Sequence, residues 1–455
     1  MRPHIWLIAL SITASACSDV PSPTVPTADA PALVSLERHT AERYVALGTS
    51  ISMGWQSNGV YDATQRVSWP ALLGFGTGNP ITLPLIESPG CTSPLVAPLG
   101  AGKRLSGESA APSTVCAPND AGVTLPTQNL GIAGAIAADA VTRTPGAGSA
   151  PWYARVLPSG MTQLTAALSQ QPTIVSIEFG GNEVLGVTTG LFAPGVTIVP
   201  FPYFVAPMTA MLDAIGATHA KVVLFEMPQS ATNLPAFRGG DEIWADRLEF
   251  AALNVDVSSD CDASPNYVNV SQKSLSIVFE AAYRHANGLP NPVFSCADVP
   301  GTLDQVVTPA DIAATAALLA QMRGFVEQQA AARGYALASL GALFDRPDLK
   351  RKPYSVVTHL TSSMPFGPLF SLDGVHASAF GHAILAIEAA RALNARYGAN
   401  FARASSAASL LTNDADVGSP TLALEMAKGV AARNAGIQLS SCVMPGECKI
   451  AAPRR

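Results

Sequence analysis

Two distant stretches of the sequence carry the residue types of acyl transfer. Asp373 and His376 stand three positions apart near one end of the chain, and Ser50 stands in the run Gly48-Thr49-Ser50 near the other. A serine hydroxyl attacks an ester when an imidazole accepts its proton and a carboxylate fixes the tautomer of that imidazole. Ser50, His376 and Asp373 therefore predict the nucleophile, the general base and the orienting acid of a serine hydrolase.

Two further segments offer donors for the oxyanion that such a reaction forms. Asn182 follows two glycines at the end of the strand-like run 173–179, where its side-chain amide is able to donate to a developing negative charge. Gly134 precedes the helical run 135–140, where a glycine lets a substrate approach the backbone amide. Taken singly, each segment also fits an ordinary turn, and Ser50 and Asp373 also fit helix caps.

The four segments occur in an order that resembles the SGNH hydrolases, also called the GDSL esterase and lipase family. The segment 370–382 resembles the last block of that family over its whole length and is the most specific match. The resemblance implies a catalytic serine, acid and base, with an oxyanion hole made of two backbone amides and one side-chain amide. The corresponding residues are the nucleophile Ser50, the acid Asp373, the base His376, and the oxyanion donors Ser50, Gly134 and Asn182.

The chain departs from the family pattern at two positions beside the expected site. Thr49 stands where the family usually has Asp, which keeps a hydrogen-bonding oxygen but loses a charge, and Glu183 stands where Asp is usual. Ser52 is a rival nucleophile, but the alignment of the block favours Ser50. The resemblance covers about residues 40 to 400, with long insertions between the blocks.

The elements that must position these residues follow an α/β alternation. The expected strands lie near 44–48, 173–179, 220–226 and 335–341, and the expected helices near 203–217, 308–332 and 377–397. Such alternation predicts a parallel sheet flanked by helices. Together with the family resemblance, it implies a three-layer α/β/α, flavodoxin-like fold. Asp373 and His376 are expected on the loop and first turn that enter the helix near 377–397, while His382 within that helix is interpreted as a packing residue.

The composition excludes several classes of protein. Only 13% of the 455 residues are charged, the net charge is -6, and the one basic cluster is Lys350-Arg351-Lys352, which argues against binding of nucleic acid. No later segment has ~20 uninterrupted apolar residues, so a polytopic membrane protein is excluded. His219, His285 and His359 are isolated, and neither a metal nor another cofactor is expected.

The N-terminal residues resemble an export signal. Arg2 precedes an apolar run and the small residues Ala14-Ser15-Ala16, after which Cys17 is the expected lipidation site of a bacterial lipoprotein. The predicted divisions are a signal peptide 1–16, a tether 17–33, a hydrolase domain 34–400 with insertions, and a helical tail 401–455. The expected location is the cell envelope, at the outer membrane or facing the periplasm, with the lipid anchor as the sole membrane contact. Without lipidation the protein would be secreted.

The number of cysteines agrees with an exported lipoprotein. Setting Cys17 aside from the seven cysteines leaves an even set of six, which suggests disulfides in an exported protein. The sequence leaves their pairing open, and pairing of neighbours is the simplest hypothesis. The candidate pairs are Cys91 with Cys116, Cys261 with Cys296, and Cys442 with Cys448. A metal site is a weaker alternative, because the chain has no Cys-x-x-Cys pair.

The predicted function is that of a serine esterase or lipase acting on a lipid-like ester or an acylated small molecule. The apolar segment 191–204 fits the wall of an acyl pocket, a lid or buried core. Because the same family includes carbohydrate O-deacetylases, an acetylated polysaccharide is the alternative substrate. A third hypothesis is a non-catalytic surface lipoprotein that binds lipid or sugar. The sequence leaves the oligomeric state open.

Overall fold

The computed structural model describes residues 42–76, 80–113, 115–350 and 352–399. The predicted signal peptide, tether and helical tail lie outside the described residues. So do the expected lipidation site Cys17 and the candidate pair Cys442 and Cys448.

A parallel four-stranded sheet forms the centre of the molecule. Its strand order is β1 (Tyr44–Gly48), β2 (Ile174–Glu178), β3 (Lys221–Glu226) and β9 (Ala336–Ser339). The segment 128–132 runs beside the outer edge of β1, where Ala46 N donates to Gln128 O and Leu130 N donates to Ala46 O, both at 2.9 Å. Counted as the second strand of the chain, this segment gives the order 2-1-3-4-5 of flavodoxin-like sheets. The predicted α/β fold with a parallel sheet is confirmed.

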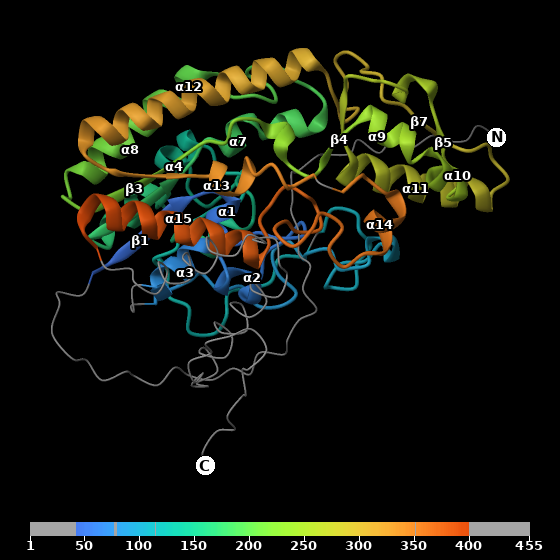
Figure 1. Ribbon diagram of the computed structural model, residues 1–455. Helices are drawn as coiled ribbons and strands as arrows, with labels where there is room; N and C mark the ends of the chain where they lie inside the picture. The colour runs from blue at the N-terminus through green and yellow to red at the C-terminus, as the bar shows by residue number, and fades with distance from the viewer. Residues whose placement is uncertain (1–41, 77–79, 114, 351, 400–455) are drawn as a thin grey trace, which may run out of the picture.

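Helices cover both faces of the sheet and complete three layers (Figure 1). One face carries α4 (Ala137–Thr142), α6 (Gln163–Ser169), α8 (Phe201–Gly216) and α12 (Pro309–Arg333). The other face carries α3 (Trp69–Gly76) and α15 (Ala379–Tyr397). In α15 the buried residues Leu385, Ala389 and Leu393 recur every fourth position, so one stripe of this helix faces the sheet. The three long helices predicted from the sequence are thus present.

The connections hold short elements that surround the ends of the central strands. They are α1 (Ser50–Met53), α2 (Asp62–Arg66), η1 (Leu99–Ala101), α5 (Tyr153–Val156), α7 (Gly181–Val184), η2 (Leu185–Thr189), α13 (Gly341–Phe344) and α14 (Val356–Thr361). The disulfide Cys91–Cys116 ties together the long connection between β1 and the segment 128–132.

A separate lobe is inserted between β3 and α12 and lies at one end of the molecule (Figure 1). It has an antiparallel sheet of three strands and a separate parallel pair, β5 with β7. The disulfide Cys261–Cys296 joins the segments that follow the two strands of this pair. Its elements are η3 (Ala231–Asn233), β4 (Phe237–Gly239), α9 (Gly240–Ala245), α10 (Arg247–Ala252), β5 (Asp256–Val257), η4 (Ser259–Cys261), β6 (Tyr267–Asn269), α11 (Val270–Ala286), β7 (Val293–Phe294) and β8 (Val306–Val307).

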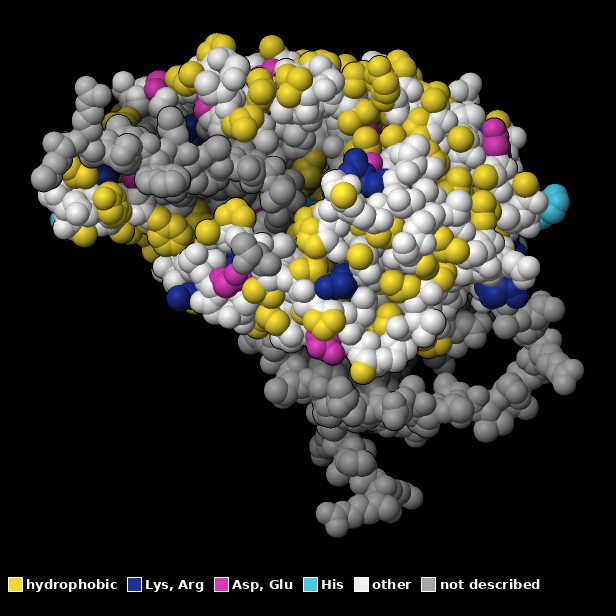
Figure 2. Space-filling model, turned by 180° about the vertical axis from the view of Figure 1, so that it is seen from behind, with side chains coloured by type: hydrophobic (Ala, Val, Ile, Leu, Met, Phe, Trp, Pro, Cys, Tyr) yellow, Lys and Arg dark blue, Asp and Glu magenta, His cyan; other side chains and the backbone are white. Residues whose placement is uncertain are grey.

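The surface reflects the low charge of the chain. On the face drawn in Figure 2, acidic and basic side chains lie scattered among apolar and neutral atoms. Among the described helices, none combines the length and the hydropathy that a membrane crossing requires.

Candidate active site

Ser50 is the first residue of α1, and only Thr49 separates it from the end of β1. Thr49 caps this helix, with its hydroxyl accepting from Ile51 N at 3.4 Å. The turn is tight, because a side chain at Gly48 would collide with the hydroxyl of Ser52. Glycine at position 48 thus lets the chain pass from the strand into the helix and presents Ser50 at the carboxyl end of the sheet, where open α/β sheets hold their ligands.

Asp373 and His376 lie together on the loop that precedes α15. One carboxylate oxygen of Asp373 accepts from Val375 N at 2.8 Å and from His376 N at 3.0 Å. The other lies 3.0 Å from His376 Nδ1. The helix begins at Ala379 with Ser378 as its N-cap. The expectation that His376 lies on the first helical turn is therefore wrong: both residues are on the loop, where backbone amides fix the carboxylate.

A continuous hydrogen-bonded chain joins the three residues. Ser50 Oγ lies 2.8 Å from His376 Nε2, although the two residues are 326 positions apart. All three side chains are buried, with 4 to 6% of each residue exposed. When Asp373 is ionised it accepts from Nδ1–H, which leaves Nε2 as the acceptor for the hydroxyl proton of Ser50. This arrangement is chemically able to activate a serine hydroxyl.

The expected oxyanion donors Asn182 and Gly134 lie at the same end of the sheet as Ser50. Asn182 stands on α7, just after β2, and its Nδ2 donates to Ala135 O at 2.8 Å. That bond fixes the amide and leaves its second N–H available. Gly134 is exposed and has a positive φ of 77°, and its amide makes no hydrogen bond with any described residue. Because Ala135 follows Gly134 directly, the bond from Asn182 holds the two expected donors side by side.

A buried carboxylate beneath the nucleophile loop was missed by sequence reasoning. Glu178, the last residue of β2, is fully buried and accepts from Thr49 N at 3.1 Å and from Ser52 Oγ at 2.9 Å. Burial raises the pKa of Glu178 to about 7, against the opposing effect of the hydrogen bonds from Thr49 and Ser52. A signal was present in the sequence, because an acidic residue inside an otherwise apolar buried strand requires hydrogen-bonding partners.

Glu183 supports the neighbouring loop in a similar way. Its carboxylate is buried and accepts from Ala137 N, at the start of α4, at 2.7 Å. Burial raises the pKa of Glu183 to about 7, and the charge of Glu178 adds to that shift. The residue that departs from the family pattern at this position therefore connects α7 to the segment carrying Gly134.

His382 lies within α15 and is fully buried. Its Nδ1 accepts from Trp69 N at 3.4 Å, and its pKa is lowered to about 3 by burial and by the nearby His376. A neutral, packed imidazole of this kind agrees with the interpretation of His382 as a packing residue. His359 is also buried, with Nδ1 bonded to the hydroxyl of Tyr354 at 2.9 Å.

An apolar pocket opens beside Ser50 and His376. Its walls come from the starts of α1 and α7, the turn after β3, the middle of α12 and the short helix α13. Ten of its sixteen lining residues are apolar, among them Leu234, Leu319 and Phe344. The segment 191–204 contributes no residue to this lining; Phe204 is instead buried core, while Tyr203 is 69% exposed. Of the three alternatives that the sequence left open for this segment, the wall of this pocket is therefore not the one observed, and Phe204 agrees with buried core.

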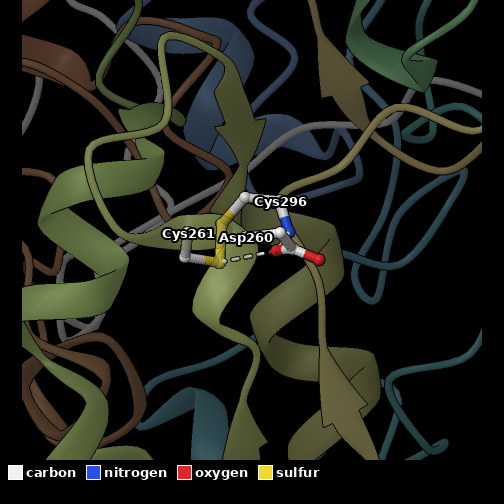
Figure 3. A group of neighbouring side chains, drawn as sticks. All are labelled: Asp260, Cys261 and Cys296. Atoms are coloured by element: carbon white, nitrogen blue, oxygen red, sulfur yellow. Dashed lines mark hydrogen bonds between the residues drawn. A yellow bond between two sulfur atoms is a disulfide. The ribbon is translucent and has the colours of Figure 1, made fainter.

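The described residues contain one cluster of metal-ligating residue types, in the inserted lobe. Figure 3 shows Asp260 beside Cys261 and Cys296, whose ligand atoms lie within 4.8 Å of one another. The two sulfurs are bonded to each other, so neither is available as a thiolate ligand. Asp260 accepts from Cys296 N at 2.7 Å and thereby anchors the disulfide-bonded turn.

No model of a known protein family matches this chain, and no curated protein matches it. Among solved structures the chain is similar to the crystal structure of an extracellular lipase from Streptomyces rimosus. The two are 15% identical over 78% of this chain and 100% of the lipase chain, with a TM-score of 0.33. A match at this TM-score carries no argument about what the chain does.

Proposed function

We propose that this protein is a carboxylic ester hydrolase with Ser50 as its nucleophile. The observation that carries the proposal is the hydrogen-bonded chain from Ser50 Oγ through His376 to Asp373, with separations of 2.8 and 3.0 Å, at the mouth of an apolar pocket. Nucleophile, base and orienting carboxylate in this relation are the arrangement of serine hydrolases on several unrelated folds.

The first half of the reaction forms an acyl-enzyme. His376 Nε2 takes the hydroxyl proton as Ser50 Oγ bonds to the ester carbonyl carbon, and Asp373 stabilises the imidazolium. The amides of Ser50 and Gly134 and the side chain of Asn182 donate to the oxyanion. The bond from carbon to the alcohol oxygen then breaks, and His376 returns its proton to the departing alcohol.

Water completes the turnover. His376 accepts a proton from water as the water oxygen bonds to the acyl carbon, and the collapse of the second tetrahedral intermediate releases the carboxylic acid. The proton held by His376 returns to Ser50 Oγ. No cofactor takes part in these steps.

We further propose that the protein is exported and anchored by a lipid on Cys17. Two features support export: the disulfides Cys91–Cys116 and Cys261–Cys296, which persist in oxidising compartments, and the signal-like N-terminal sequence. Radiolabelled fatty acid incorporated into the full chain, and lost in Cys17→Ala, tests the anchor. Export without incorporation would indicate a secreted protein.

The experiment on function compares hydrolysis of p-nitrophenyl esters by the full chain and by Ser50→Ala. The expected loss of kcat in Ser50→Ala is about 10⁴-fold or more. The control is Ser276→Ala, because Ser276 lies on α11 in the inserted lobe and bonds only to Lys273 O among the described residues. Equal turnover by Ser50→Ala and the native chain would refute the proposal. Folded protein without turnover on any ester would favour the non-catalytic lipid- or sugar-binding protein.

A further inference from the structure

We infer that the pocket beside Ser50 binds the acyl part of the ester and selects acyl chains of about six to eight carbons, because about five to seven methylene-sized groups fit into it beyond the carbonyl carbon. This inference rests on the proposed function. Medium-chain acyl esters are thus the preferred substrates, rather than acetyl esters or esters of long fatty acids.

The lining of the pocket fits a hydrocarbon chain. Beyond the residues of the proposed catalytic site, its lining is mostly apolar and includes the buried side chains of Leu319 on α12 and of Leu340 and Phe344 near α13. None of its sixteen lining residues is Asp, Glu, Lys or Arg. A carboxylated or sugar-like group would lose its hydrogen bonds to water there without replacement, whereas methylene groups gain from burial.

The size of the pocket limits the length of the chain. Its cavity volume is about 70 Å³. A cavity needs about 10–15 Å³ of such volume for one water molecule, so this pocket takes about five to seven groups of that size. A methylene group is close to water in size. An acetyl group therefore leaves most of the pocket unfilled, and a palmitoyl chain extends far beyond it.

The chemistry of deacylation assigns the pocket to the acyl part of the ester. The attacking water occupies the position that the alcohol has left, next to His376 Nε2. Water is held poorly in an apolar cavity, because it needs polar partners that such a lining lacks. The alcohol and the attacking water therefore belong on the polar, solvent-facing side of Ser50, and the apolar pocket receives the chain that stays bound to Ser50.

Two positions allow the pocket to be altered in opposite directions. Ala231, on η3, lines the pocket and is only partly buried, so Ala231→Leu adds bulk to the pocket. Leu319 is 1% exposed, so Leu319→Ala extends the pocket toward α12. The neighbouring Leu318 is also buried on α12 but does not line the pocket, and Leu318→Ala is the matched control.

The experiment measures kcat/KM for p-nitrophenyl acetate, butyrate, hexanoate, octanoate and dodecanoate with the full chain. The expected optimum is hexanoate or octanoate, with acetate at least ~10-fold lower, the usual value of one or more buried methylenes. Ala231→Leu should move the optimum toward acetate and Leu319→Ala toward dodecanoate, while Leu318→Ala keeps the native optimum. Thermal unfolding of each variant establishes that it is folded; if Leu319→Ala fails to fold, Ala231→Leu still tests the pocket.

The outcomes separate this inference from the function on which it rests. Ser50-dependent hydrolysis with its optimum at acetate, butyrate or dodecanoate would overturn the inference and leave the hydrolase intact. An optimum that neither pocket variant moves would do the same. A series of alkyl acetates should show little dependence on alkyl length, and a strong preference for hexyl acetate would assign the pocket to the alcohol instead. No Ser50-dependent hydrolysis of any ester would refute the proposed function and the inference with it.

Discussion

The hydroxyl of Thr49 donates to both carboxylate oxygens of Glu178, at 3.0 and 2.9 Å, and joins the nucleophile loop to the neighbouring strand. The register of the sheet creates this contact, because Glu178 on β2 pairs with Gly48 on β1. Glu178 thus holds the nucleophile loop from the adjacent strand.

This contact predicts that an acidic residue at position 49 is harmful in this chain. Thr49→Asp would place a second carboxylate beside the buried Glu178, and two such groups cannot both ionise without a large cost. We expect kcat to fall about tenfold or more, the effect of a coupling of about 1.4 kcal/mol between contacting residues. Steady-state kinetics on a butyrate or hexanoate ester provides the measurement.

The double variant distinguishes charge repulsion from simple loss of Thr49. Glu178→Gln removes the second charge, so Thr49→Asp combined with Glu178→Gln should be more active than Thr49→Asp alone. If the loss of activity in the double variant equals the sum of the losses in the two single variants, the two positions do not interact, contrary to the geometry.

Asn182 is predicted to act mainly in the transition state. Its amide is fixed by Ala135 O, so Asn182→Ala removes one positioned donor together with the bond that holds the loop of Gly134 beside it. The expected loss is on the order of 10² to 10³ in kcat with little change in KM. Asn287→Ala is the control, since Asn287 also donates to a backbone carbonyl, that of Tyr283, but on the exposed end of α11. Near-normal turnover by Asn182→Ala would remove this residue from the proposed oxyanion hole.

The buried His382 predicts a loss of stability in acid. Burial lowers its pKa from 6.5 to about 3, so between these values the unfolded chain binds a proton that the folded chain does not. Its contribution is fully present above pH 6.5 and decreases as the pH falls toward 3. His382→Gln should therefore be less stable than the native chain at pH 7.5, and the gap should shrink by about 1 to 3 kcal/mol at pH 4.5.

Urea unfolding at the two pH values measures that gap. His285→Gln, at an exposed position on α11, controls for the loss of a histidine as such. A gap that stays constant or widens in acid would show that His382 is not held neutral by its surroundings.

The parallel sheet and its helices were predictable from the sequence for a simple physical reason. Buried parallel strands are short continuous apolar runs, and the runs at 44–48 and 220–226 match β1 and β3 closely. The long helices carry their apolar residues at helical spacing and end at glycines, such as Gly334 after α12. Local pattern therefore carries most of the information about these elements.

The inserted lobe and the pocket depend on contacts that no local pattern reveals. Strands β5, β7 and β8 have two residues each, too few to show a periodicity. The pocket is built from Leu234, Leu319 and Phe344, which meet only after the chain has folded. The apolar segment 191–204 resembled a pocket wall because buried core and ligand-lining residues have the same composition.

The candidate site likewise contains residues that the sequence identifies and residues that only the folded structure reveals. Ser50, Asp373 and His376 were identified as residue types in a recognisable order, and their separations agree with that hypothesis. An acid in a buried strand signals that Glu178 has polar partners, but the sequence does not show which residues those partners are. Its contacts with Thr49 and Ser52 follow from strand register, which is set by the pairing of the whole sheet.

The central claim is that Ser50 is an activated nucleophile, and covalent labelling tests it most directly. The native chain, Ser50→Ala and Ser52→Ala are treated with a fluorophosphonate probe, and the modified residue is located by peptide mass spectrometry. We predict one adduct per chain, on Ser50, present in the native chain and in Ser52→Ala and lost in Ser50→Ala and after acid denaturation. An adduct on Ser52, or no adduct on folded native protein, would contradict the account.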